Sequence, residues 1–139
     1  MTPLQTIRRF LFAILVIGMS GTAVELLLLK HDEDPYQLIP LVLLATGLVV
    51  AIAHEVRSAR ATATAVRVTM TAFVVAGLMG LYLHYRANVE FQLEGDPSLA
   101  GVALLVKALE AKTPPALAPG VMVQLGLLGL AYTFRHRER

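Results

Sequence analysis

The chain has 139 residues, 56% of them hydrophobic and 16% charged, which allows one domain and far more apolar surface than a soluble core of this size can bury. The formal net charge of +2 is compatible with nucleic-acid binding, but the basic residues flank apolar runs as in membrane proteins, so we exclude nucleic acid as a partner. The chain has no cysteine, which excludes disulfides, thiolate metal sites and a cysteine nucleophile.

Four apolar runs follow one another along the chain, at residues 10–29, 36–53, 66–85 and 117–134. Each is close to the roughly 20 residues that a helix needs to cross about 30 Å of hydrocarbon. Helices are expected because lipid offers the backbone no hydrogen-bond partner. The sequence therefore predicts an all-α fold. We expect a polytopic integral membrane protein, a four-transmembrane-helix bundle that forms a single membrane domain over residues 1–139.

The first run also has some features of a cleaved signal peptide. It follows basic residues and contains the small residues Gly21, Thr22 and Ala23, which are typical of a cleavage site. Apolar residues continue through Leu29, however, and complete a full span. We therefore favour a retained first helix.

Basic residues near the runs are distributed unequally between the two sides of the membrane. Eight fall on one side and four on the other when the runs are treated as four crossings. The first set is Arg8, Arg9, Arg57, Arg60, Arg67, Arg135, Arg137 and Arg139, and the second is Lys30, Arg86, Lys107 and Lys112. The positive-inside rule predicts that the N- and C-termini are cytoplasmic and that the protein is integral to the plasma (inner) membrane.

The segment between the third and fourth runs is long enough to form structure outside the membrane. Its first part is expected to extend the third helix, and Gly95 then interrupts it. Asp96 and Pro97 are typical of a helix start. After them Leu99, Val102, Val106 and Leu109 recur at three- and four-residue spacing. The pattern predicts a short extracytoplasmic amphipathic helix over about residues 97–111.

Small residues recur inside all four runs and indicate close packing between helices. They serve either packing within the bundle or a face for association with a second copy or another membrane protein. None of their spacings gives a strict GxxxG motif. The small residues are Gly18, Gly21, Thr22, Ala45, Gly47, Gly77, Gly80, Gly126 and Gly129.

Polar residues on the predicted outer side form the candidate site. Glu25 is the only acid inside a run, and His31, His84 and Glu90 are expected on the same side of the membrane. Imidazole and carboxylate groups are ligands for a divalent metal such as zinc. The alternative is a solvated acidic surface with an Arg86–Glu90 ion pair. On the cytoplasmic side, His54 and Glu55 sit among arginines that are expected to face anionic headgroups.

The sequence contains no Gly-rich phosphate loop, no GxSxG motif and no HExxH pair. We therefore expect a small non-enzymatic accessory or scaffold subunit, without a cofactor. It would act in the lipid bilayer through helix–helix association in a homo-oligomer or a larger membrane complex. The alternative is extracytoplasmic divalent-cation or proton binding and transport using Glu25 and His84. A small membrane enzyme that uses the same polar residues is a third hypothesis. Convergence of Glu25, His84 and Glu90 in one pocket would favour binding or chemistry.

Overall fold

The computed structural model describes residues 2–30, 35–111 and 117–134, and within those ranges it has five helices and no strand. The helices are α1 (Pro3–Leu28), α2 (Leu38–Val56), α3 (Arg60–Gly95), α4 (Gly101–Leu109) and α5 (Ala118–Tyr132). Each of α1, α2 and α3 is long and apolar enough to cross a membrane, and α5 is a shorter apolar helix of 15 residues. The prediction of an all-α protein is confirmed, and three of the four predicted spans coincide with helices that can cross a bilayer.

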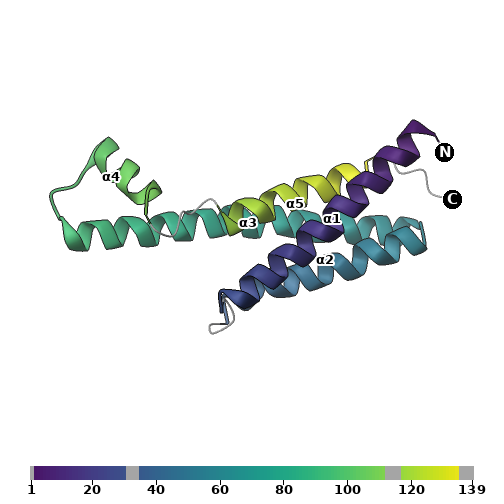
Figure 1. The fold of residues 1–139 in the computed structure, drawn as a ribbon, viewed down its shortest axis with the longest axis horizontal. Helices are drawn as coiled ribbons and strands as arrows, with labels where there is room; N and C mark the ends of the chain where they lie inside the picture. Colours follow the sequence, from purple (N-terminus) through teal and green to yellow (C-terminus); the bar gives the residue numbers. More distant parts are fainter. Residues whose placement is uncertain (1, 31–34, 112–116, 135–139) are drawn as a thin grey trace.

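Four helices pack around one core (Figure 1). α1 and α3 each contact both α2 and α5, so α1 and α3 face each other diagonally across the bundle. The buried residues of α3 recur at three- and four-residue spacing, which is typical of helices packed at shallow angles. They are Ala63, Val66, Met70, Phe73 and Gly77. This buried stripe stops well before α3 ends, because only the first part of α3 has neighbours on both sides.

Side chains of the local sequence determine where α1 and α3 begin. Thr2 and Gln5 form a reciprocal capping box at the start of α1, and Pro3 occupies the first helical position, where no backbone N–H is needed. In the first turn of α3, the Thr62 hydroxyl accepts from the backbone N–H of Ala59, the residue just before the helix, at 3.2 Å. These contacts satisfy donors that a helix start leaves open.

Glycines set the distance between α3 and α5. A Cβ placed on Gly126 would lie 2.7 Å from the Met70 carbonyl oxygen, and one on Gly77 would lie 2.7 Å from the Pro119 carbonyl oxygen. Both values are far below an ordinary contact, so the two backbones approach this closely only because these positions lack side chains. By contrast, Gly21 has open space around its Cβ position. Most of the predicted small residues therefore serve packing within the bundle.

α3 continues beyond the bundle and carries α4. Its 36 residues span about 54 Å, well beyond the roughly 30 Å of a hydrocarbon core. α4 folds back and packs on this extension (Figure 1). There the Asn88 side-chain amide donates to the Ala108 carbonyl oxygen at 3.1 Å. We call the α3 extension with α4 the outer arm.

α4 begins four residues later than the predicted start at Pro97. The reason is that Asp96 does not cap the helix. Its carboxylate accepts from the Ser98 backbone N–H at 3.1 Å and from the Ser98 hydroxyl at 2.6 Å, which closes a turn instead. Gly101, with a positive φ of 58°, then opens the helix; a positive φ suits glycine because it has no Cβ to clash.

Candidate functional site

Polar side chains from all four bundle helices gather at one end of the bundle. The amino end of α1 and the carboxyl end of α5 both lie there (Figure 1). We call this the polar end, and the opposite end of the bundle the far end. The polar end consists of Arg8, His54, Glu55, Thr62, Arg67, Tyr132 and Thr133, together with the Phe134 carbonyl.

Two arginine side chains donate hydrogen bonds to backbone carbonyl oxygens at the carboxyl end of α5. Arg8 Nη2 donates to the Phe134 carbonyl oxygen and Arg67 Nη2 donates to the Thr133 carbonyl oxygen, each at 3.0 Å. The last carbonyls of a helix have no partner inside the helix, and positive charge is favourable at that end. These bonds therefore attach α5 to α1 and to α3 at the same level.

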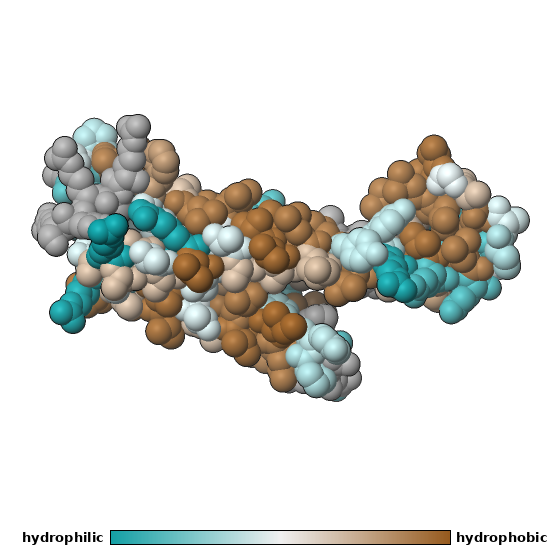
Figure 2. Space-filling view, turned by 180° about the vertical axis from the view of Figure 1, so that it is seen from behind, coloured by the Kyte–Doolittle hydropathy of each residue, from teal (hydrophilic) through white to brown (hydrophobic). Residues whose placement is uncertain are grey.

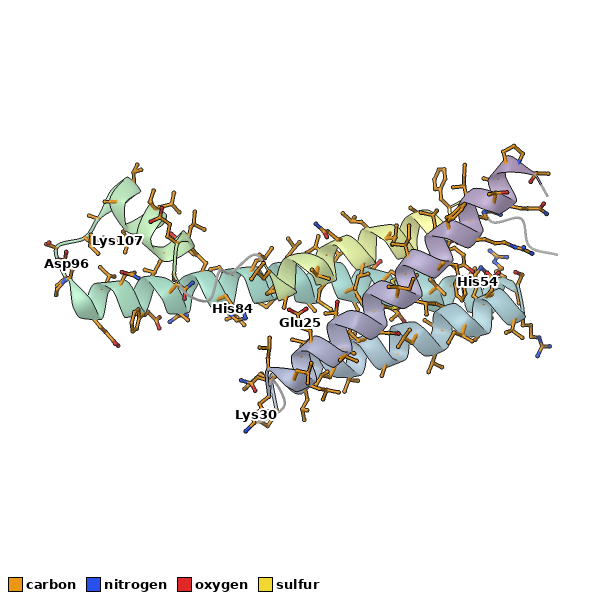
Figure 3. All side chains as sticks on the ribbon, in the orientation of Figure 1. Glu25, Lys30, His54, His84, Asp96 and Lys107 are labelled. Carbon is orange, nitrogen blue, oxygen red and sulfur yellow. The ribbon has the colours of Figure 1, made fainter. Side chains whose placement is uncertain are left out.

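His54 is buried at the point where α2 and α3 meet, with 1% of its surface exposed (Figure 3). Its Nδ1 lies 2.9 Å from the Thr62 hydroxyl oxygen. That hydroxyl is also 2.9 Å from the Arg57 and Ala59 carbonyl oxygens. It has a single hydrogen, so whenever it donates to a carbonyl, the Nδ1–H of His54 is the donor in the bond they share.

Tyr132 connects α5 to α2 through its hydroxyl group. The ring is buried between Phe12, whose ring centroid is 5.8 Å away, and His54, which meets it edge-on at 5.7 Å. The Tyr132 hydroxyl donates to Glu55 Oε2 at 2.6 Å, a short bond typical of a carboxylate acceptor. The Glu55 side chain is exposed, so the buried Tyr132 side chain is hydrogen-bonded to a carboxylate that water can reach.

The hydrogen bonds of the polar end join the four bundle helices to one another. Each of the bonds described above joins two helices or a helix and its adjoining turn, and each donor faces a carbonyl, carboxylate or hydroxyl oxygen. Sequence reasoning assigned His54 and Glu55 to an arginine-rich rim and missed the buried network. The spacing did contain a signal: Leu44, Gly47, Ala51 and His54 form a continuous buried stripe on α2.

The predicted metal ligands that the structure describes lie on two helices, α1 and α3. Glu25 lies exposed on α1 and His84 half-buried on α3, two helices that are diagonal in the bundle (Figure 3). Glu90 accepts from Arg86 Nε at 2.8 Å, the ion pair that the sequence offered as an alternative. His31 lies outside the described residues. Across residues 2–30, 35–111 and 117–134, no group of three or more His, Asp or Glu side chains is placed to hold a metal ion.

Comparisons of the chain with protein-family models, with curated proteins and with solved structures find no match. The functional proposals therefore rest on the geometry alone.

Proposed function

We propose that this chain is a non-enzymatic accessory or scaffold subunit that crosses the plasma (inner) membrane four times and acts through helix–helix association. Both termini would lie in the cytoplasm and the outer arm on the other side. The bond from Arg8 to the Phe134 carbonyl supports the number of crossings, because it places the start of α1 and the end of α5 at one end of the bundle. If α1, α2 and α3 each cross, α5 must return across the membrane to reach Arg8.

The length of α5 is compatible with this return. Its start packs against Gly77 and Gly80, and its end lies beside Arg67. Including its apolar flanks, the segment at residues 117–134 would extend about 27 Å, close to the hydrocarbon thickness. α5 therefore occupies the same layer as the first part of α3.

Cysteine labelling tests the topology, since the chain has no cysteine of its own. Single cysteines at Thr2 and Phe134 should both be protected from an impermeant maleimide in intact cells, whereas one at Asp96 should react. Labelling of Phe134→Cys with protection of Thr2→Cys would mean that α5 does not cross. Labelling of both, with protection of Asp96→Cys, would invert the orientation.

The outward face of α1 is the surface that supports association. Gly21 lies between large exposed apolar side chains, and nothing approaches within 4 Å of its Cβ position. A neighbouring helix can approach closely at such a point, and close packing is a main source of helix association in lipid. The exposed apolar residues of this face are Phe10, Ile17, Val24 and Leu28.

Energy transfer between labelled chains in lipid vesicles tests this association. Gly21→Leu should lower the transfer efficiency at a fixed protein-to-lipid ratio. Ala131→Leu is the matched control, because it places the same side chain at an exposed position on α5. Equal transfer in the two variants would show that the face of α1 around Gly21 meets only lipid.

Cation binding through Glu25 and His84 remains the second hypothesis and has weaker support. The two side chains come from diagonal helices, and Glu90 is engaged by Arg86. A site at the far end would therefore need ligands beyond those described here.

A further inference from the structure

α4 presents an apolar face that no other helix in the described part of the chain covers. It packs on α3 through Ala108, which is buried, and Leu104, which is half-buried. The other apolar side chains point away from this contact. Their exposed fractions are 76% for Val102, 43% for Leu105, 43% for Val106 and 49% for Leu109. The helix is thus attached by Leu104 and Ala108, while four other apolar side chains remain uncovered.

The level of α4 relative to the bundle follows from the bond between Asn88 and Ala108. Asn88 lies 21 residues after Arg67, one of the two arginines described at the polar end. This separation corresponds to about 31 Å along the axis of α3. This length matches a hydrocarbon core of about 30 Å. If the polar end lies at one boundary of that core, the carboxyl end of α4 lies at the other.

The headgroup layer beyond that boundary is several ångströms thick, and amphipathic helices insert their apolar face about 5–10 Å into the boundary region. Leu109 and Val106 are nearest to it, because α4 runs from the tip of the outer arm back toward the bundle (Figure 1). Figure 2 shows apolar side chains over much of the outer arm as well as along the bundle.

The composition around this level also suits a membrane boundary. The exposed ring of Tyr82 lies on α3 about 9 Å before Asn88 on the bundle side, and tyrosine is enriched where membrane meets water. Lys107 is exposed about 100° around the helix from Val106, and Glu110 is exposed at the edge of the uncovered apolar face. A helix with one apolar and one charged face is typical of the interface.

We propose that α4 docks on the lipid surface at the far end, with Val102, Leu105, Val106 and Leu109 turned toward the acyl chains. The lipid surface would then hold the outer arm at a fixed angle to the bundle. This proposal depends on the membrane placement of the bundle described above, but not on association between chains.

Tryptophan fluorescence tests the proposal, because the chain contains no tryptophan. Val106→Trp is the probe, with Leu109→Trp as a second one at the end nearer the bundle. Lys107→Trp is the matched control, since it is one residue away and about 100° around the helix. Val75→Trp, at an exposed site within the span of α3, reports whether the bundle is inserted. Each variant is reconstituted in phosphatidylcholine vesicles with and without dibrominated acyl chains.

The expected result is a blue-shifted Val106→Trp emission that brominated lipid quenches nearly as strongly as it quenches Val75→Trp, while Lys107→Trp is quenched weakly. Quenching of Val75→Trp without quenching of Val106→Trp or Leu109→Trp would overturn the docking of α4 and leave the span intact. A blue shift that depends on protein concentration, without quenching by brominated lipid, would instead indicate that a second copy of the chain covers this face. Absence of quenching at Val75→Trp would refute the membrane placement itself.

Discussion

The close approach of α3 and α5 makes Gly126, like Gly77, a position where an added side chain would meet backbone atoms of the other helix. A Cβ there would lie 2.7 Å from the Met70 carbonyl oxygen, 2.7 Å from Val74 Cγ2 and 3.0 Å from the Val74 backbone nitrogen. Two of these three atoms belong to the backbone of α3, so a change of side-chain rotamer cannot relieve the clash. Gly126→Ala must therefore push the two helices apart.

The expected cost follows from the size of that displacement. Ordinary carbon contacts lie at about 3.5–4.0 Å, and a gap of 0.5–1 Å forfeits a quarter to a half of each contact energy along the interface. Overpacking of this kind typically costs about 1–3 kcal/mol. Part of the cost is offset because alanine favours the helix over glycine by up to about 1 kcal/mol. We expect a net loss of about 1–2 kcal/mol, or roughly 5–30-fold in the folding equilibrium.

The measurement is unfolding in mixed micelles of mild detergent and dodecyl sulfate, followed by the near-ultraviolet circular dichroism of the tyrosines. Gly21→Ala is the matched control, because the same added methyl group meets open space on α1. It should leave the free energy of unfolding unchanged or raise it slightly. If Gly126→Ala and Gly21→Ala unfolded at the same dodecyl sulfate fraction, the close contact between α3 and α5 would be refuted.

Three further predictions concern polar groups. Tyr132→Phe removes the bond to Glu55 and should lower the free energy of unfolding by about 0.5–1.5 kcal/mol; additive losses in the double variant with Glu55→Ala would argue against the bond. The cation hypothesis predicts that zinc binds the parent protein and binds His84→Ala more weakly in calorimetry, and equal heats would remove His84 from any metal site. Hydrogen bonds from Ser98 lower the pKa of the Asp96 carboxyl. The ionised carboxylate therefore stabilises the folded turn fully at pH values above the pKa of Asp96 in the unfolded chain. This stabilisation is lost as the pH falls through the lower pKa of the folded state. Carboxyl NMR titration of Ser98→Ala should therefore show a raised Asp96 pKa, and an unchanged value would contradict this cause.

The positions of the bundle helices were predictable from the sequence because lipid imposes a simple requirement. A continuous apolar run of suitable length has few structures open to it other than a helix. The predicted run at residues 10–29 corresponds to α1, and the run at residues 66–85 lies inside α3. The start of α4 was harder to predict, because the Asp96 carboxylate can cap a helix or close a turn with Ser98. The sequence contains the same residues in both cases, and only the backbone conformation around them distinguishes the two outcomes.

The polar end was not predictable in the same way, because most of its bonds join residues that are distant in the sequence. Tyr132 and Glu55 are 77 residues apart, and Arg8 and Phe134 are 126 residues apart. Neither pair has a local pattern that marks it. Only the helix register of α2 indicated that His54 continues a buried stripe. The neighbouring arginines were a stronger signal and indicated an exposed rim.

Different interactions join the helices at the polar end and along the α3–α5 contact, and they have different effects on the fold. At the polar end, hydrogen bonds connect all four helices, whereas toward the far end the α1–α2 pair diverges from α3 and α5 (Figure 1). Interhelical hydrogen bonds in membrane proteins average only about 0.6 kcal/mol, so the bonds of the polar end together contribute roughly 2 kcal/mol, comparable with the expected cost of Gly126→Ala. They act mainly on register, because sliding α5 by one turn would leave the Tyr132 hydroxyl and the last carbonyls of α5 without partners. Glycine packing therefore supplies much of the stability of the α3–α5 pair, and the polar end determines the level at which the helices meet.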